Sequence, residues 1–578
     1  MGEFKLSDPF GTAPKTAPFS QSVSQGVAWH NLPVTRDYTL GQLLDQTVAR
    51  CGENDALVYA DRDYRLTWYE FSEEVDRVAR GLMALGVKHG EKVALWATNV
   101  PHWIILMFAT AKIGAILLPL NINYKRDEID FALKQSDAEN LFIIDGYRDC
   151  NYVNVINGLI PELKTSPRGE LKSARYPALK RVFFLGGAKY RGMYSLDELK
   201  SLAVETPWGD YLKRQGECDV HDVVNMQYTS GTTGFPKGVQ LTHWNIANDG
   251  YWIGACQNLS SRDKICIPVP LFHCFGCVLG VMSCVNHGAT MVLLEKFDPL
   301  AVLNSIEKER CTATYGVPTM YIAIMDHPAF EKYDLKSLRT GIMSGSACPV
   351  HRMQQANDRM YMREITNPYG LTESGPVMTM TRYFETSIER KCATIGQALP
   401  GVEVAIIDPE TRELSPVGKD GEICCRGYGN MKGYYKQPEA TAKCIDENGW
   451  LHSGDIGHMD ADGYYYITGR LKDIIIRGGE NISPKEVEDF IGTMPGVKDV
   501  AVVGCPSKKY GEQPAAFVIP QPGANLKPED VGAFCKDRIS WFKIPKYVKL
   551  VDTFPMTASQ KIQKYKLREL AHDLWPNA

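Results

Sequence analysis

The sequence lacks the features that would place it in several common classes of protein. No G-x-x-x-x-G-K-[ST] segment occurs in its 578 residues, which excludes the usual Walker phosphate loop. The net charge of −4 gives no basic excess, so nucleic acid is not expected as a partner. The most apolar long run, Trp103 to Leu120, contains Lys112 and Gly114 and is typical of a core helix and strand, so no integral membrane segment is predicted.

Cysteine is present, but not in a pattern that indicates disulfides. The 16 cysteines have no regular spacing and are interpreted as reduced thiols of a cytoplasmic protein. The first 35 residues contain no arginine and no apolar segment of the signal-peptide type, so no targeting segment is predicted. One dense Cys/His group suggests a metal or redox site, but its apolar surroundings favour buried thiols that act as small hydrophobes. It consists of Cys266, His273, Cys274, Cys277, Cys284 and His287.

The order of apolar segments predicts at least two domains. A chain of 578 residues is too long for one core. Strand-like and helix-like segments alternate over most of the sequence, which predicts an α/β fold of mostly parallel sheets layered with helices. Near residue 470 the pattern changes to that of a small α+β domain. We therefore expect an irregular lead-in over residues 1–35, a large N-terminal domain over 36–471 and a small C-terminal domain over 472–578.

Local signals predict individual elements. Thr67 and Glu70 form a capping-box pattern at the start of one helix, and Ser483 before Pro484 predicts the N-cap of another. Further helices are expected over 40–49, 109–116, 299–309 and 528–538, and strands over 92–96, 116–120, 265–267, 291–294, 313–315, 500–503 and 515–519.

One segment is unusually rich in hydroxyl groups and glycine. From Tyr228 onward, eight of eleven residues are hydroxylated or glycine, and Lys237 is the single cation among them. Such a segment suits a polyphosphate, because its hydroxyls, its glycine N–H groups and its one ammonium can face a common point. Pro236 stiffens the segment and a strand-like run follows it, which argues against a flexible linker. The sequence therefore predicts a phosphate-binding loop that is not of the Walker type.

This segment resembles the phosphate-binding loop of the adenylate-forming superfamily, which includes acyl-CoA synthetases, nonribosomal adenylation domains and firefly luciferase. Four further motifs follow in the order typical of that superfamily, and together they cover the chain from about residue 40 to its end. They are Tyr369-Gly370-Leu371-Thr372-Glu373, Gly449-Trp450-Leu451-His452-Ser453-Gly454-Asp455, Gly469-Arg470-Leu471-Lys472-Asp473 and the segment Pro555 to Lys564. The resemblance implies a large domain with a small mobile C-terminal domain, and ATP, Mg²⁺ and coenzyme A as the cofactors.

The resemblance also implies the roles of residues around ATP. Glu373 is expected to hold Mg²⁺, a hard cation that prefers carboxylate and phosphate oxygens, and Thr372 to donate to the α-phosphate. The β- and γ-phosphates are expected on Thr229, Ser230, Gly231, Thr232, Thr233, Gly234 and Lys237. Adenine is expected to stack on Tyr369 against Gly345, Ser346 and Ala347, with Asn367 near its amine and with Asp455 and Arg470 at the ribose or phosphate.

The C-terminal segment is expected to carry the adenylation lysine. Lys561 would reach the substrate carboxylate and the α-phosphate, although Gln560 stands where the superfamily usually has glycine. Lys472 matches the hinge about which the small domain turns between the two half-reactions. After that rotation, coenzyme A is expected to contact Gly479, Phe542 and Lys543.

The resemblance implies an apolar acyl pocket. His273 is expected to line it and to shift between the half-reactions, and the other wall residues are expected to be Phe272, Phe275, Gly276, Val317, Met343, Leu371 and Met378. The predicted activity is an AMP-forming acyl-CoA synthetase for medium-length or branched fatty acids. An aryl-CoA ligase for benzoate-like acids, a luciferase-like enzyme and a stand-alone adenylating enzyme are the alternatives, and a homodimer is left open.

Overall fold

The computed structural model describes residues 21–29, 33–229, 236–345, 350–477, 480–536, 538–557 and 562–576. These residues form two compact units, and each is described by itself. The first comprises Gln25–Val404 and Cys425–Leu451, and the second comprises Ala405–Cys424, the described residues from His452 onward and those before Gln25. The predicted domain boundary at residue 472 therefore lies within the second unit. That the C-terminal domain moves about this residue stays a prediction. In the described parts of the chain, no helix combines the length and apolarity needed to cross a bilayer.

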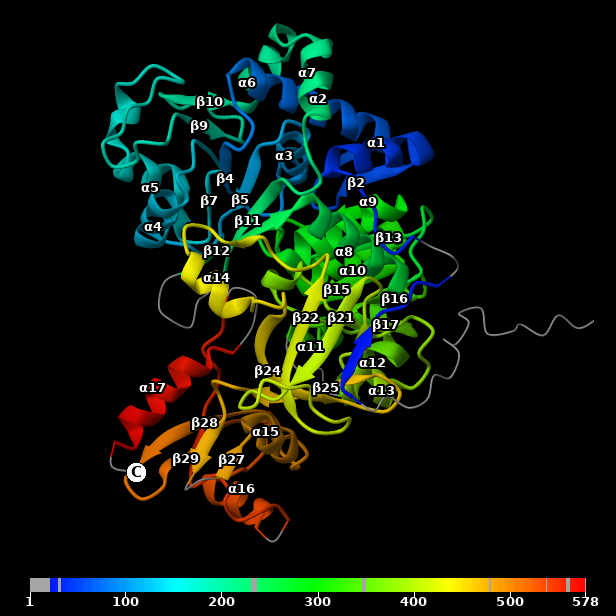
Figure 1. The fold of residues 1–578 in the computed structure, drawn as a ribbon, viewed down its shortest axis with the longest axis vertical. Coiled ribbons are helices and arrows are strands. Elements are labelled where there is room, and N and C mark those ends of the chain that lie inside the picture. Colours follow the sequence, from blue (N-terminus) through cyan, green and yellow to red (C-terminus); the bar gives the residue numbers. More distant parts are fainter. Residues whose placement is uncertain are drawn as a thin grey trace, which may run out of the picture. The chain divides into compact units, whose positions relative to one another are not determined.

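An eight-stranded sheet in the first unit carries the predicted phosphate loop. The six strands from β10 to β11 are parallel to one another. Strand β12 is antiparallel to β11, and β23, at the edge, is antiparallel to β12. Helices α4 (Arg126–Ser136) and α5 (Tyr152–Leu159) pack on it through one buried cluster (Figure 1). In spatial order the strands are β10 (Met193–Ser195), β9 (Arg181–Phe184), β6 (Asn140–Ile143), β4 (Lys92–Trp96), β5 (Ile116–Pro119), β11 (Val223–Thr229), β12 (Lys237–Thr242) and β23 (Gly433–Tyr434).

A seven-stranded sheet forms the second layer of the first unit. Its strands are parallel except for the hairpin of β2 and β3. Helices α10 (Pro299–Glu309), α11 (Pro318–Met325) and α12 (Val350–Arg359) bury their apolar faces against it. In spatial order the strands are β17 (Glu364–Thr366), β16 (Thr340–Met343), β15 (Ala313–Gly316), β13 (Lys264–Ile267), β14 (Thr290–Leu293), β2 (Asp55–Tyr59) and β3 (Tyr64–Thr67). The two sheets confirm the predicted layered α/β fold.

Helix capping explains where several predicted helices begin and end. Thr67 caps α2, and the reciprocal bonds with Glu70 complete the predicted capping box. The helix expected over 109–116 is wrong in its bounds: α3 runs from Pro101, whose fixed φ suits the first turn, and ends before Gly114 at φ +72°. The remaining helices of the first unit are α1 (Leu40–Cys51), α2 (Trp68–Ala84), α6 (Leu196–Ser201), α7 (Trp208–Gly216), α8 (His243–Cys256), α9 (Ser283–His287), α13 (Ile388–Ala393) and α14 (Pro438–Cys444).

The second unit is built on two five-stranded sheets. The first has the order β1 (Val23–Gln25), β21 (Val402–Ile407), β22 (Gly421–Gly427), β24 (Leu451–Met459) and β25 (Tyr465–Arg470). The second contains β27 (Glu480–Ile482), β26 (Ile475–Arg477), β29 (Gly511–Pro520) and β28 (Val497–Ser507), with β30 (Tyr547–Leu550) paired to β29. Its helices are α15 (Pro484–Gly492), α16 (Pro528–Cys535) and α17 (Lys564–Leu574).

Both faces of the second of these sheets are covered by helices. Because side chains alternate along a strand, Val500 and Val502 face α15 and α16, whereas Ala501 and Val503 face α17. This explains why the strand is apolar at consecutive positions. Ser483 is the N-cap of α15 as predicted, but its hydroxyl donates to the Thr468 carbonyl instead of capping the helix.

Candidate active site

The two ends of the predicted phosphate loop are held by a β-ladder. Thr229, the last residue of β11, pairs across the hairpin with Lys237, the first residue of β12. The ammonium of Lys237 lies 4.7 Å from the ring centroid of Tyr434. The predicted loop residues Ser230, Gly231, Thr232, Thr233 and Gly234 lie outside the described residues. The hairpin therefore brings a threonine hydroxyl and a lysine to the base of this loop.

The same hairpin lies beside the predicted magnesium ligand. Glu373 belongs to a short helical turn, Thr372–Ser374, and its carbonyl accepts from Met431 N at 2.8 Å. Its Oε1 accepts a hydrogen bond from the Tyr434 hydroxyl at 2.8 Å and one from the Thr229 hydroxyl at 3.5 Å. Among the described residues, Oε2 accepts no hydrogen bond. One carboxylate oxygen is thus fixed by the protein and the other is available to a ligand.

Tyr434 is a site residue that the sequence did not single out. Burial, and then the charge of Glu373, raise the pKa of the Tyr434 phenol well above its usual value. The phenol therefore stays protonated and can only donate to the carboxylate. Its strand, β23, pairs with β12 although the two are distant in sequence. Only this long-range pairing places Tyr434 beside Glu373, so no local signal could have revealed it.

Two other predicted residues, Thr372 and His273, meet through a buried thiol. Cys274 Sγ lies 3.5 Å from His273 Nδ1 and 3.8 Å from Thr372 Oγ1. Phe275 N donates to His273 Nδ1 at 3.1 Å, so that nitrogen acts as an acceptor and the neutral ring carries its proton on Nε2. A π-helical segment, Phe275–Met282, begins immediately after this group. The structure thus brings His273 and Thr372 together, as predicted residues of one site.

The predicted adenine wall is described in part. Tyr369 lies on β18 (Pro368–Tyr369), which pairs with β19 (Thr379–Met380), and β19 pairs with β20 (Gln397–Ala398). Gly345 has φ +92°, and a Cβ there would lie 3.0 Å from Val317 Cγ1, so a side chain would be both strained and crowded. Asn367 is buried, and its amide donates to the Thr394 carbonyl at 3.2 Å. Ser346 and Ala347 lie outside the described residues.

Two predicted ATP contacts form an ion pair in the second unit. Asp455 and Arg470 face each other across β24 and β25, with Arg470 Nε 2.7 Å from Asp455 Oδ1. The Asp455 side chain is 5% exposed and that of Arg470 is 60% exposed. The pair was not anticipated from the sequence, because it depends on the register of two strands. The arginine holds the buried carboxylate in one orientation.

The remaining C-terminal predictions fall at different places in the second unit. Lys472 lies in an exposed turn after β25, and its carbonyl accepts from the Arg568 guanidinium at 3.4 Å. Lys543 forms an ion pair with Glu486, and Phe542 is partly buried against the core cluster under α15. Lys561, with Gln560, and Gly479 lie outside the described residues.

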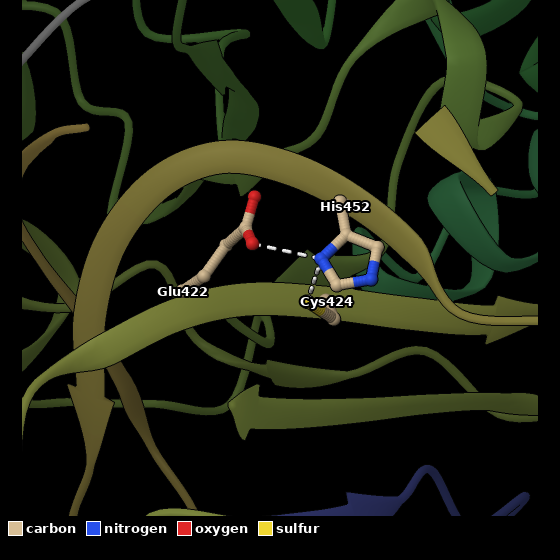
Figure 2. A group of neighbouring side chains, drawn as sticks. All are labelled: Glu422, Cys424 and His452. Atoms are coloured by element: carbon tan, nitrogen blue, oxygen red, sulfur yellow. Dashed lines mark hydrogen bonds and ion pairs between the residues drawn. The ribbon is translucent and has the colours of Figure 1, made fainter. Parts of the chain in front are cut away.

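In the Cys/His group noted in the sequence, His273 lies beside Cys274, whereas His287 and Cys277 contact residues outside the group. His287 stacks on Tyr251 and contacts its carbonyl at 2.9 Å, and Cys277 Sγ accepts from the Gln227 amide at 3.4 Å. In the described parts of the chain, a different group has three ligand atoms within 4.8 Å of one another: Glu422, Cys424 and His452 (Figure 2). No spacing in the sequence indicates this group, because its members come from two different strands, β22 and β24.

Comparison with known proteins places these features in a family. The model of the AMP-binding enzyme family matches residues 44–435, and that of the AMP-binding enzyme C-terminal domain matches residues 486–561. YngI of Bacillus subtilis (strain 168), named as an acyl-CoA synthetase, is 50% identical over 531 residues, which are 92% of this chain and 96% of YngI. The mitochondrial medium-chain acyl-CoA ligase ACSF2 of Danio rerio is 37% identical over 559 residues, 96% of this chain and 91% of that protein.

A solved structure gives the same result for the fold. The anthranilate CoA ligase AuaEII, in complex with anthranoyl-AMP, superposes with a TM-score of 0.81 at 25% identity, and the match covers 94% of this chain and 99% of AuaEII. The chain therefore belongs to the AMP-binding enzyme family, within the adenylate-forming superfamily. Within that family its relatives make it an AMP-forming acyl-CoA ligase, with a carboxylic acid, ATP and coenzyme A as substrates.

Proposed function

We propose that this enzyme activates a medium-length or branched monocarboxylic acid as an acyl-adenylate and transfers the acyl group to coenzyme A. The observation that carries the proposal is the Glu373 carboxylate, fixed by Tyr434 and Thr229 at the base of the hydroxyl-rich loop. The name of ACSF2, a medium-chain ligase, supports the chain length, and the acyl-adenylate bound to AuaEII supports the intermediate.

The residues around Glu373 fit a bound Mg²⁺. The chemistry of the donor set is right, because Mg²⁺ prefers carboxylate oxygens and usually keeps several waters and phosphate ligands. Oε2 is the oxygen that would hold the ion, since Oε1 already accepts two hydrogen bonds. When bound, Mg²⁺ would neutralise phosphate charge during the attack of one anion on another. Tyr434 and Thr229 would keep the carboxylate in place.

The first half-reaction is proposed to use the residues that the sequence motifs predict for ATP. The loop from Thr229 to Lys237 would hold the β- and γ-phosphates through hydroxyl and N–H donors, and Thr372 would donate to the α-phosphate. Tyr369 would stack on adenine, with Gly345, Ser346, Ala347 and Asn367 around it. Asp455, oriented by Arg470, would accept from the ribose hydroxyls. Lys561 would approach the carboxylate and α-phosphate oxygens as their charges meet.

The second half-reaction requires that Lys561 leave and that a thiol enter. We propose that Lys472 acts as the hinge for this exchange, because it lies in an exposed turn between β25 and β26. Gly479, Phe542 and Lys543 would then contact coenzyme A. His273 would line the path of the acyl group, and its neutral ring is suited to a mainly apolar wall.

The acyl preference is proposed from the apolar character of the expected wall. Phe275, Val317 and Met378 are buried, and each methylene transferred from water into such a wall contributes about 0.8 kcal/mol. A second carboxylate buried there without a partner would cost several kcal/mol. Benzoate-like acids are the second candidate, because AuaEII is an anthranilate ligase.

The test is kcat/KM for thioester formation with straight-chain acids of increasing length, a branched acid, benzoate and a dicarboxylate. We expect kcat/KM to rise by roughly fourfold per methylene, as follows from the methylene value above, and to reach its maximum at medium length. A maximum at acetate or at the dicarboxylate would contradict the proposed pocket. A maximum at benzoate would replace the aliphatic assignment with the aromatic one.

A further inference from the structure

Three side chains of different chemistry meet between two strands of the second unit. Glu422 and Cys424 lie two residues apart on β22 and therefore on the same face of the strand, and His452 lies on β24 beside it (Figure 2). His452 Nδ1 is 2.7 Å from Glu422 Oε2 and 3.3 Å from Cys424 Sγ. The side chains of Glu422 and His452 are 7% and 12% exposed, and Cys424 is fully buried.

Both short distances in this group involve the same atom, His452 Nδ1. A neutral imidazole carries either a proton or a lone pair on Nδ1. With a proton, Nδ1 can give a full hydrogen bond to the carboxylate or to the sulfur, but not to both at once. With a lone pair, it accepts from the thiol but faces the carboxylate oxygen, another acceptor, at 2.7 Å. A single cation would instead be bound by the oxygen, the sulfur and the nitrogen at the same time.

The distances are close to those of a metal site. Tetrahedral Zn²⁺ with its usual bond lengths requires about 3.4 Å between nitrogen and oxygen ligands and about 3.6 Å between nitrogen and sulfur ligands. The observed 2.7 and 3.3 Å separations would have to widen by about 0.7 and 0.3 Å, within the reach of side-chain torsions. All three ligand atoms already lie within 4.8 Å of one another.

The donor set also selects among cations. A thiolate and an imidazole suit Zn²⁺ and disfavour Mg²⁺ and Ca²⁺, which prefer oxygen ligands. One carboxylate and one thiolate balance the two positive charges, so the buried complex carries no net charge. We propose that Glu422, Cys424 and His452 form a Zn²⁺-binding site, separate from the magnesium ligand Glu373. Binding forms one bond each from Oε2, Sγ and Nδ1 to the metal, and the Cys424 thiol releases its proton to solvent.

The site is tied to a residue of the proposed ATP site. Glu422 Oε1 accepts a hydrogen bond from Gly454 N at 2.9 Å, and Gly454 directly precedes Asp455. A metal bound by Glu422 and His452 would therefore brace the backbone from His452 to Gly454, directly before Asp455. An effect of the metal on nucleotide binding through Asp455 rests on the proposed function, whereas metal binding itself does not.

The neighbouring cysteine provides a matched control. Cys425 is also a buried free thiol on β22, but it points to the opposite side of the strand, where its sulfur lies 3.6 Å from Asn430 Oδ1. Cys424→Ser and Cys425→Ser therefore remove one buried thiol each from adjacent positions. Only the first should affect metal binding.

The test is titration of the full-length, metal-depleted, reduced protein with Co²⁺ as a spectroscopic substitute for Zn²⁺. We expect the absorption of a thiolate-to-cobalt charge-transfer band, at one metal per chain, which Zn²⁺ displaces. Cys424→Ser should abolish this band, and Cys425→Ser should retain it. His452→Gln and Glu422→Gln keep the thiol and should weaken Co²⁺ binding at least tenfold, which decides the question if Cys424→Ser fails to fold. Absence of the band, or a band of equal intensity in Cys424→Ser, would overturn the proposal whether or not the enzyme acts on fatty acids.

Discussion

Replacing Tyr434 with phenylalanine tests the hydrogen bond on which the proposed magnesium site depends. The substitution removes the hydroxyl that donates to Glu373 Oε1 at 2.8 Å and keeps the ring beneath the Lys237 ammonium. Hydrogen bonds to charged groups contribute about 1.5–3 kcal/mol, and each 1.36 kcal/mol is a factor of ten in rate. If this bond holds the carboxylate during adenylation, the loss should be roughly 10- to 100-fold.

The effect should be confined to one half-reaction and should depend on Mg²⁺. We expect acid-dependent ATP–pyrophosphate exchange by Tyr434→Phe to fall by that factor and to recover in part at high Mg²⁺. Thioester formation from a supplied acyl-adenylate should be nearly unchanged, because that step no longer needs the phosphate ligands.

The adjacent tyrosine is the control for this experiment. Tyr435 also donates to a carboxylate, that of Asp137, at 2.9 Å, so Tyr435→Phe removes a comparable bond one residue away. We expect this variant to keep wild-type exchange activity and its dependence on Mg²⁺. Equal losses in the two variants would show that both act on folding, and an unchanged Tyr434→Phe enzyme would refute a positioning role for Tyr434.

Three further predictions concern other parts of the chain. Lys561→Ala should lower pyrophosphate exchange on the order of 10²- to 10³-fold, as for other positioned electrostatic groups, with transfer from a supplied adenylate retained; equal loss of both would contradict the assigned role. Lys472→Pro fixes φ and should preserve adenylation while thioester formation falls sharply, and unchanged turnover would exclude the hinge. Burial raises the pKa of Asp249 well above its usual value, against a hydrogen bond from Val377 N that lowers it. The folded state therefore keeps a proton that the unfolded chain loses, and this costs stability as pH rises above the unfolded pKa. In urea unfolding, the free energy of unfolding of Asp249→Asn minus that of wild type should therefore be larger at pH 8 than at pH 4. A difference that does not change with pH would contradict this prediction.

Elements defined by local signals were predictable from the sequence. The capping box of Thr67 and Glu70 forms as expected, and α10 runs from Pro299 to Glu309, the predicted bounds. The start of α3 at Pro101 was missed because its N-terminal turn has no polar N-cap side chain: the N-cap residue is Val100. Periodicity alone could not locate the ends of a helix that is buried on nearly every side.

The parts of the site that sequence could not predict depend on which strands pair and in which register. Tyr434 reaches Glu373 only because β23 pairs with β12, and Arg470 meets Asp455 only through the register of β24 and β25. The group of Glu422, Cys424 and His452 likewise joins two strands that are neighbours in the sheet but not in the chain. Motifs predicted the reacting residues, and the side chains that contact them became visible only in the fold.

The measurement that tests the central claim most directly is isotope exchange between pyrophosphate and ATP in the absence of coenzyme A. An enzyme that forms an acyl-adenylate should catalyse this exchange with a medium-length acid and Mg²⁺ alone, and should release AMP once coenzyme A is added. Exchange that requires coenzyme A, or the appearance of ADP and phosphate as products, would contradict the account.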